Sequence, residues 1–142
     1  MPGIFSNKSI LIVDDDARML KALERVLTQE GASVMCAEVA TDAFKILAAR
    51  AGQFNLVITD LRMPFLRGEK TINIIHEILP ELPIIVLTAF GGPEVRAECA
   101  RLGAAAFLEK PLDSIHLVDV IKQIFDTGNV DGENRQIGSA ES

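Results

Sequence analysis

The sequence predicts an α/β fold in which a five-stranded parallel sheet is covered on both faces by five helices. Short apolar runs of strand length alternate with longer stretches whose apolar residues recur at helical spacing. Such alternation is typical of parallel sheets, which are buried on both faces and joined by helical crossovers. Because these crossovers are right-handed, a doubly wound sheet with strand order 2-1-3-4-5 is the simplest topology.

Each element is predicted from a local pattern. We expect strands at residues 10–13, 33–38, 55–59, 84–87 and 105–108. The helices are predicted from apolar stripes at Leu20, Leu23 and Leu27; Phe44, Leu47 and Ala48; Ile72, Ile75 and Leu79; Val95, Cys99 and Leu102; and Leu117, Ile121 and Ile124. Thr41 is expected to cap the second helix, and Pro93 to open the fourth. Residues 63–68 read as a loop, and the last helix should end near residues 127–128.

Length and composition limit the classes of protein. The 142 residues fit one domain, which we assign to residues 1–127, followed by a flexible polar tail at 128–142. No apolar stretch approaches the roughly 20 residues of a membrane span, and the start lacks a signal peptide, so we expect a cytoplasmic protein. A net charge of −6 argues against direct binding to nucleic acid. Cys36 and Cys99 lack CxxC spacing and are expected to be buried thiols.

Polar side chains follow four of the predicted strands at the point where each strand ends. Asp14 and Asp15 follow the first strand, and Asp60 follows the third. Thr88 follows the fourth strand, and Lys110 follows the fifth. The carboxyl ends of parallel strands lie at one edge of the sheet, where open α/β sheets bind ligands. We therefore expect these five residues to form one site.

Three clustered carboxylates need a partner. Two ionised carboxylates about 4 Å apart repel each other by about 4 kcal/mol at an effective dielectric of about 20. This is a large part of a domain's stability, which is only about 5–15 kcal/mol. Mg²⁺ is a hard cation that favours carboxylates, water and phosphate oxygens, so the pattern predicts a Mg²⁺ site. The alternative is that these acids are separate helix caps or loop residues that never meet.

The four strand ends together resemble the receiver domain of two-component response regulators, the CheY-like superfamily with a flavodoxin-like fold. The motifs that carry the resemblance are Val13-Asp14-Asp15-Asp16, Thr59-Asp60-Leu61-Arg62-Met63-Pro64, Leu87-Thr88-Ala89 and Phe107-Leu108-Glu109-Lys110-Pro111. Each motif is weak alone, but all four occur in order at matching strand ends. The resemblance covers roughly residues 8–126.

The resemblance implies a phosphorylation site. Asp60 would accept a phosphoryl group from a sensor histidine kinase or a histidine phosphotransfer protein. Asp15 and Asp60 would hold Mg²⁺, with Asp14 assisting through water and Arg62 donating its backbone carbonyl. Lys110 would bridge to the phosphoryl group. The chain would then be a signalling switch rather than an enzyme.

The resemblance also implies a switch. Thr88 would swing inward to bond the phosphoryl group, and Phe107 stands at the family's aromatic switch position, where Tyr is commoner. Gly68 matches the family's loop glycine. Arg62 and Phe90 stand where the family tunes the lifetime of the phosphoryl group. The moving face would be that of the fourth helix, the fifth strand and the fifth helix.

More than one partner and output fit the sequence. We expect a downstream effector protein or domain, and a homodimer could form on phosphorylation. The chain is either a stand-alone receiver or part of a longer regulator, and the string at residues 107–111 resembles receivers attached to ATPase-type transcription activators. His76 and His116 are expected to be solvated or interface residues rather than phosphotransfer groups.

Two other functions fit parts of the pattern. A protein-binding module could keep the receiver fold without being phosphorylated. A haloacid dehalogenase-like phosphohydrolase would also use a DxD after a strand and a later Thr and Lys. Three features count against the phosphohydrolase. Asp14-Asp15-Asp16 is followed by Ala17-Arg18 and so does not form a DxDxT motif, and 142 residues leave no room for a recognisable cap domain. The remaining acid, Asp60, precedes Thr88 instead of following Lys110.

Overall fold

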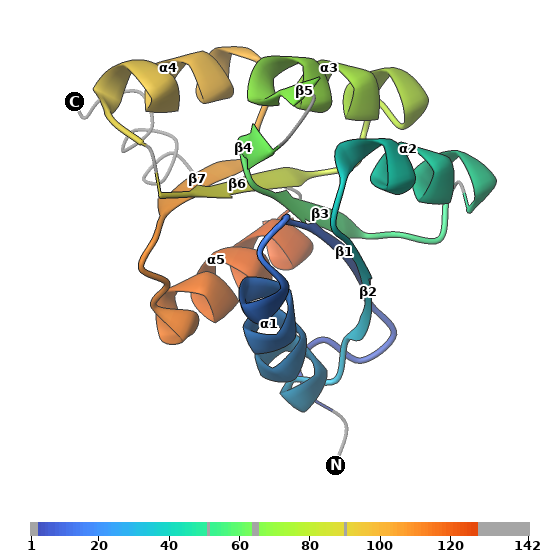
Figure 1. Ribbon diagram of the computed structural model, residues 1–142. Helices are drawn as coiled ribbons and strands as arrows, with labels where there is room; N and C mark the ends of the chain where they lie inside the picture. The colour runs from blue at the N-terminus through green and yellow to red at the C-terminus, as the bar shows by residue number, and fades with distance from the viewer. Residues whose placement is uncertain (1–2, 51, 64–65, 90, 128–142) are drawn as a thin grey trace.

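A computed structural model of the protein describes residues 3–50, 52–63, 66–89 and 91–127, which form a parallel sheet between two layers of helices (Figure 1). The strands of the main sheet are β1 (Ser9–Val13), β2 (Ser33–Ala37), β3 (Leu56–Thr59), β6 (Ile84–Thr88) and β7 (Ala106–Glu109). The helices are α1 (Ala17–Gln29), α2 (Ala40–Ala49), α3 (Gly68–Ile78), α4 (Pro93–Arg101) and α5 (Ser114–Thr127).

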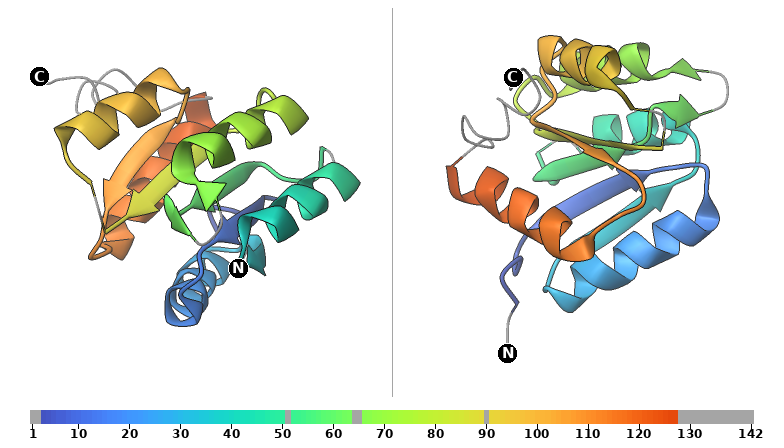
Figure 2. Two further views of the ribbon diagram at one scale, coloured as in Figure 1. Left: turned by 45° about the horizontal axis from the view of Figure 1, so that its top comes forward. Right: turned by 90° about the vertical axis from the view of Figure 1, so that its left-hand side faces the viewer.

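The topology confirms the predicted doubly wound sheet. The five strands lie in the order β2-β1-β3-β6-β7, which is 2-1-3-4-5 in chain order, and every neighbouring pair is parallel. Helices α1 and α5 cover one face, while α2, α3 and α4 cover the other (Figure 2). This arrangement places β1, β3 and β6 in the middle of the sheet, where both faces are buried.

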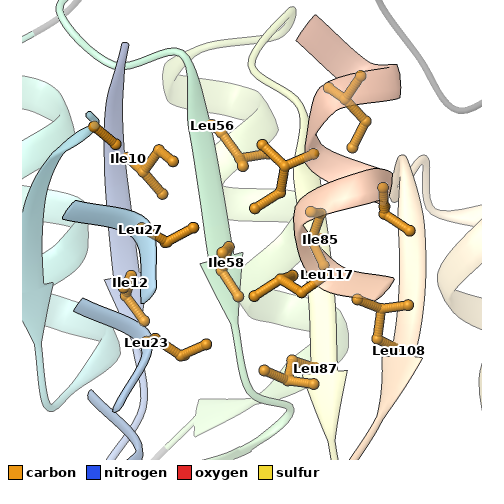
Figure 3. Close-up of a cluster of buried hydrophobic side chains, with 14 of the residues drawn as sticks. Ile10, Ile12, Leu23, Leu27, Leu56, Ile58, Ile85, Leu87, Leu108 and Leu117 are labelled. Carbon is orange, nitrogen blue, oxygen red and sulfur yellow. The ribbon is translucent and has the colours of Figure 1, made fainter. Parts of the chain in front are cut away.

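Successive residues of each strand point to opposite faces of the sheet and so fill two separate cores. In β1, Ile10 and Ile12 pack towards α1 and α5, as Figure 3 shows, whereas Leu11 and Val13 pack towards α2 and α3. All four are at most 1% exposed. Burying one such side chain contributes about 1.5–3 kcal/mol, which explains why these strands are continuously apolar.

Two predicted element ends are confirmed, and the cap of α1 is a further finding. Asp16 caps α1 by accepting hydrogen bonds from backbone N–H groups of the first turn. Pro93 is the first residue of α4, after Gly92 at φ 147°, and α5 ends at Thr127. The predicted flexible tail at residues 128–142 lies outside the described residues.

Three expectations were wrong. The segment read as a loop contains a short antiparallel pair, β4 (Arg62–Met63) and β5 (Leu66–Arg67), whose two-residue strands are too short to give a periodic signal. Thr41 does not cap α2, because the helix already begins at Ala40 and Val39 at its N-cap makes no side-chain hydrogen bond. Cys99 is buried as expected, but Cys36 is exposed because β2 is an edge strand.

The segment before β1 closes the end of the core between α1 and α5. Phe5 is fully buried, and its backbone N–H donates to the carbonyl of Glu30 at 2.8 Å. Its ring meets that of Phe125 edge to face, with the ring centroids 5.4 Å apart. Lys8 Nζ lies 5.0 Å from the centroid of Phe125, on the same cluster.

Among the residues that the structure describes, none of the helices combines the length and the apolar character needed to cross a bilayer.

The packing of Phe5 gives a test of the core. We expect Phe5→Ala to lower the free energy of unfolding by about 3 kcal/mol, because it leaves a cavity beside Phe125. The neighbouring Ile4 is 52% exposed, so Ile4→Ala should change it by no more than about 0.5 kcal/mol. Urea unfolding of the three proteins measures both values. Equal small losses would show that the segment does not belong to the core.

Candidate functional site

The carboxyl edge of the sheet gathers the polar residues because each follows directly on a strand. Main-chain hydrogen bonds continue the strand pairing by one residue: Asp14 N donates to Ala37 O at 3.1 Å, and Asp60 N donates to Val13 O at 3.0 Å. Lys110 N likewise donates to the carbonyl of Thr88 at 2.9 Å. These main-chain hydrogen bonds therefore hold the backbone at all three positions independently of the side chains.

The three acids expected from the strand ends do meet. One carboxylate oxygen from each of Asp14, Asp15 and Asp60 lies within 4.8 Å of the others. Asp14 and Asp60 are only 2% and 6% exposed, while Asp15 is exposed to solvent. Such a set, with two buried oxygens and one open side, fits a cation like Mg²⁺ that keeps several waters. The alternative that these acids never meet is therefore excluded.

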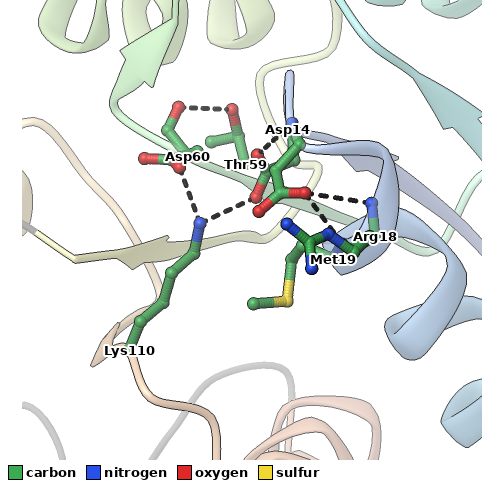
Figure 4. Close-up of polar contacts among 7 residues, drawn as sticks. Asp14, Arg18, Met19, Thr59, Asp60 and Lys110 are labelled. Carbon is green, nitrogen blue, oxygen red and sulfur yellow. Dashed lines mark hydrogen bonds and ion pairs between the residues drawn. The ribbon is translucent and has the colours of Figure 1, made fainter.

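Lys110 reaches across the edge of the sheet to two of these acids. Its Nζ donates to Asp14 Oδ2 and to Asp60 Oδ2, both at 2.9 Å (Figure 4). The side chain of Lys110 is 14% exposed, and the Lys110–Pro111 peptide bond is cis. Charge-assisted hydrogen bonds of this length are stronger than those between neutral groups. A single, partly buried ammonium therefore joins the ends of strands β1, β3 and β7.

Burial and ion pairing shift the pKa values of Asp14 and Lys110. Burial raises the pKa of Asp14 above its ordinary value of 3.8, although the Asp16 N–H and the Lys110 ammonium both act to lower it. Burial also acts to lower the pKa of Lys110, but hydrogen bonds to Asp60 and Asp14 outweigh it, so this pKa lies above 10.5. Lys110 is therefore charged at neutral pH, and its contribution to stability is lost only as the pH rises through the raised value.

Local hydrogen bonds hold the acids in place. Asp14 Oδ1 accepts from the backbone N–H of Asp16 at 2.9 Å, and Asp16 Oδ1 accepts from that of Arg18 at 3.0 Å. The hydroxyl of Thr59 donates to the carbonyl of Asp60 at 3.1 Å. The bond from Thr59 was not expected from sequence, because a Thr inside an apolar run reads as a strand residue.

The other residues predicted from the sequence lie near this edge or on neighbouring elements. Thr88 is the last residue of β6 at the same edge and is fully buried. Phe107 lies in β7, is 8% exposed and packs on the side of α4. Arg62 belongs to β4 and Gly68 begins α3, but the side chain of Arg62 and the surroundings of Gly68 lie outside the described part of the chain. Phe90 also lies outside it.

Neither histidine joins the acidic cluster. His76 is half-buried on α3 and faces the turn at Gly103. His116 is exposed on α5. His116 is therefore solvated, as expected, whereas His76 packs partly against its own domain.

The raised Asp14 pKa predicts an effect on stability. Because the pKa is higher in the folded state, this carboxyl's contribution is present below pH 3.8 and is lost as the pH rises through the raised value. We therefore expect Asp14→Asn to raise the free energy of unfolding at neutral pH, without divalent cations. The gain should shrink in acid.

The control is Asp16→Asn, because Asn caps a helix as well as Asp. This variant removes a neighbouring carboxylate that is exposed, so it should be close to neutral. Urea unfolding as a function of pH checks both. If the Asp14→Asn protein were less stable than the wild type at neutral pH, the prediction would be contradicted.

Known proteins match this chain both in sequence and in structure. A family model described as "Response regulator receiver domain" matches residues 10–122. The response regulator FleR of Pseudomonas aeruginosa is 34% identical over 112 residues, which are 79% of this chain and 23% of FleR. The transcriptional regulatory protein GlrR of Escherichia coli is 37% identical over 112 residues, 79% of this chain and 25% of GlrR. The chain thus spans about a quarter of the length of these relatives.

Solved structures agree with these matches. A CheY-like receiver domain from Methanospirillum hungatei is 30% identical, with a TM-score of 0.79 over 85% of this chain and 95% of that one. The CheX–CheY–BeF3–Mg²⁺ complex of Borrelia burgdorferi contains a chain that is 26% identical, with a TM-score of 0.80 over 83% of this chain and 89% of that one. Fold, matched range and identity point the same way, and the chain belongs to the family of response regulator receiver domains of two-component systems.

Proposed function

We propose that this receiver is a phosphorylation-dependent switch of the cytoplasm in which Asp60 accepts a phosphoryl group. The observation that carries the proposal is the buried carboxylate of Asp60, which lies 2.9 Å from the Lys110 ammonium and within 4.8 Å of two further carboxylates. An acid cluster with one fixed cation is costly as mere structure, but it suits an incoming phosphoryl group together with a metal ion. The donor would be a sensor histidine kinase or a histidine phosphotransfer protein.

The metal ion in this proposal is Mg²⁺. Asp15 and Asp60 would bind it directly, Asp14 would assist through water, and Arg62 would offer its backbone carbonyl. The ion would neutralise charge on the phosphoryl oxygens. Support comes from the clustered carboxylate oxygens and from the CheX–CheY–BeF3–Mg²⁺ complex among the related structures.

Asp60 and Lys110 have different roles in the proposed phosphoryl transfer. An Asp60 carboxylate oxygen attacks phosphorus, and the bond from phosphorus to the donor's histidine nitrogen breaks, so that the electron pair stays on that nitrogen. Lys110 already donates to this carboxylate and can bridge to a phosphoryl oxygen. Phosphoryl transfer depends mainly on positioning and electrostatics, which these groups supply.

The switch would follow from the added charge. Phosphorylation brings about −1.5 to −2 charge and three acceptor oxygens. New charged hydrogen bonds from Thr88 and Lys110 would contribute about 1.5–3 kcal/mol each, and shifting a two-state equilibrium from 1:99 to 99:1 takes about 5.5 kcal/mol. Two such bonds are about enough to move Phe107 and the face formed by α4, β7 and α5.

The output of the proposed switch would come from a partner protein or domain. This chain matches only about a quarter of FleR and GlrR, which are a response regulator and a transcriptional regulator. We propose that the receiver passes its state to a downstream effector protein or domain and can pair with a second copy when phosphorylated. It does so as a switch without catalytic output of its own.

Labelling with acetyl phosphate tests the proposed acceptor. With Mg²⁺, we expect intact mass to show one phosphoryl adduct on the wild type and none on Asp60→Asn, because only Asp60 is the nucleophile. Asp16→Asn, which leaves the acid cluster complete, should be labelled like the wild type. An adduct that persists in Asp60→Asn would place the acceptor elsewhere. No adduct on any protein would favour a receiver-like binding module that is not phosphorylated.

Unfolding in the presence of Mg²⁺ tests the metal site separately. A ligand at 100 times its Kd stabilises the folded state by about 2.7 kcal/mol. We expect saturating Mg²⁺ to raise the midpoint of urea unfolding for the wild type and for Asp16→Asn, but much less for Asp15→Asn. Asp15 is exposed, so its loss should not disturb the fold itself. Equal Mg²⁺ effects on all three proteins would argue against Asp15 as a ligand.

A further inference from the structure

Thr59 is a buried polar residue at a position where an apolar residue would fit. It is the last residue of β3 and is fully buried. Its partners in the register of the sheet are Val13 of β1 and Val86 of β6. Val57, two residues earlier in β3, points to the same face. Valine has the shape of threonine without the hydroxyl, so packing against these neighbours does not explain a polar group here.

The hydroxyl of Thr59 is unfavourable in this environment unless a hydrogen bond replaces the one it would make to water. The structure supplies such a bond, because Thr59 Oγ1 donates to the main-chain carbonyl of Asp60 at 3.1 Å (Figure 4). The other polar or charged residues that are buried in the described part of the chain are Asp14, Asp60, Thr71 and Thr88. Three of these four belong to the proposed site. A polar group that interrupts an apolar core is expected mainly at a functional site, and Thr59 adjoins one.

The carbonyl that accepts this bond lies where the chain leaves the sheet. β3 ends at Thr59, and β4 begins at Arg62. On one side of the Asp60 Cα atom, the Asp60 N–H donates to Val13 O at 3.0 Å and so holds the peptide group between Thr59 and Asp60. On the other side, the bond from Thr59 Oγ1 holds the peptide group between Asp60 and Leu61. Both peptide groups next to the Asp60 Cα atom are therefore restrained.

This restraint acts on two of the proposed Mg²⁺ ligands. The Asp60 carboxylate projects from the Cα atom between the two peptide groups, and Lys110 Nζ holds it from outside at 2.9 Å. The main chain that leads on to the carbonyl of Arg62 starts at the Asp60–Leu61 peptide group. The hydroxyl of Thr59 thus restrains the main-chain side of the site, while Lys110 restrains the side chain.

We propose that Thr59 is a positioning residue whose hydroxyl orients the Asp60–Leu61 peptide group and so prepares the site for Mg²⁺. The inference rests on the proposed function. Without the bond, the peptide group can adopt further orientations, and only a fraction of the molecules has the ligands in place. The apparent affinity falls by that fraction. One hydrogen bond between neutral groups corresponds to a change of about two- to tenfold in such a population.

The test compares variants that keep or remove the donor. Thr59→Val and Thr59→Ala both lack the hydroxyl, whereas Thr59→Ser keeps it. The control Val57→Ala removes packing from the same strand and the same face, two residues away from Thr59. A second control, Thr28→Val, removes a hydroxyl that donates to the main-chain carbonyl of Glu24 at 2.7 Å in α1, away from the sheet.

Three measurements are made on each protein. Mg²⁺ alone is titrated and followed by backbone amide chemical shifts, since the chain has no Trp or Tyr. Labelling by acetyl phosphate is followed by intact mass over a range of Mg²⁺ concentrations. Urea unfolding without Mg²⁺ reports the stability of the fold itself.

We expect Thr59→Val to need about two- to tenfold more Mg²⁺ for half-saturation than the wild type, both in the shift titration and in labelling. At saturating Mg²⁺ its labelling rate should approach that of the wild type, because the ion then holds the ligands in place. Its urea midpoint should stay close to that of the wild type, since the variant removes a buried hydroxyl together with the hydrogen bond. Thr59→Ala should share the raised Mg²⁺ requirement, so the comparison does not depend on how valine packs.

The other variants separate the donor from the packing. Thr59→Ser should need no more Mg²⁺ than the wild type, even where loss of the methyl group lowers its urea midpoint. Val57→Ala should unfold at lower urea but keep the Mg²⁺ requirement of the wild type, because it leaves the bond to Asp60 intact. Thr28→Val should also keep that requirement.

The outcomes distinguish this role from the proposed function. If the wild type binds Mg²⁺ and is labelled, but Thr59→Val and Thr59→Ala need no more Mg²⁺, the positioning role is wrong and the proposed function stands. The role is also wrong if Thr59→Ser is as weak as Thr59→Val, or if Val57→Ala shows the same increase, because packing is then responsible. If the wild type neither binds Mg²⁺ nor is labelled, the proposed function fails and the role of Thr59 fails with it.

Discussion

The ammonium of Lys110 is the charge on which the acidic edge of this domain depends. It is the centre of a contact among three strands, and it compensates two carboxylates that are nearly out of water. Ionised groups in such surroundings repel each other unless a cation is close. Burial raises the pKa of Asp14 although the Lys110 ammonium acts to lower it. A metal ion at this edge would add positive charge and so lower the repulsion between the carboxylates.

Much of the architecture can be predicted from the sequence, because strands that are buried on both faces of the sheet are continuously apolar. Runs such as residues 10–13 and 84–87 are continuously apolar, which only a buried strand or helix interior tolerates, and their length decides for strand. The site follows from the same logic. Once the strands are parallel, Asp14, Asp60 and Lys110 must share one edge, and the structure brings their side chains into contact.

Other features were beyond sequence because they depend on packing between distant elements. The β4–β5 pair is only four residues in all, and its strands alone carry no periodicity. The exposure of Cys36 is set by the edge position of β2, which depends on the order of the whole sheet. The contact of Arg96 with Phe107 joins residues on two elements, and in the sequence Arg96 reads only as a charged position on an amphipathic helix.

Phe5 bears on where this domain can be cut or joined to another protein. The family match begins at residue 10 and stops at residue 122, but Phe5 and Phe125 lie outside those limits and pack against each other. A fragment excised at the matched limits would leave a hole lined by the ends of α1 and α5. For fusions and chimaeric regulators, the working unit is therefore wider at both ends than the shared sequence, and its seam should fall before Gly3 and after Thr127.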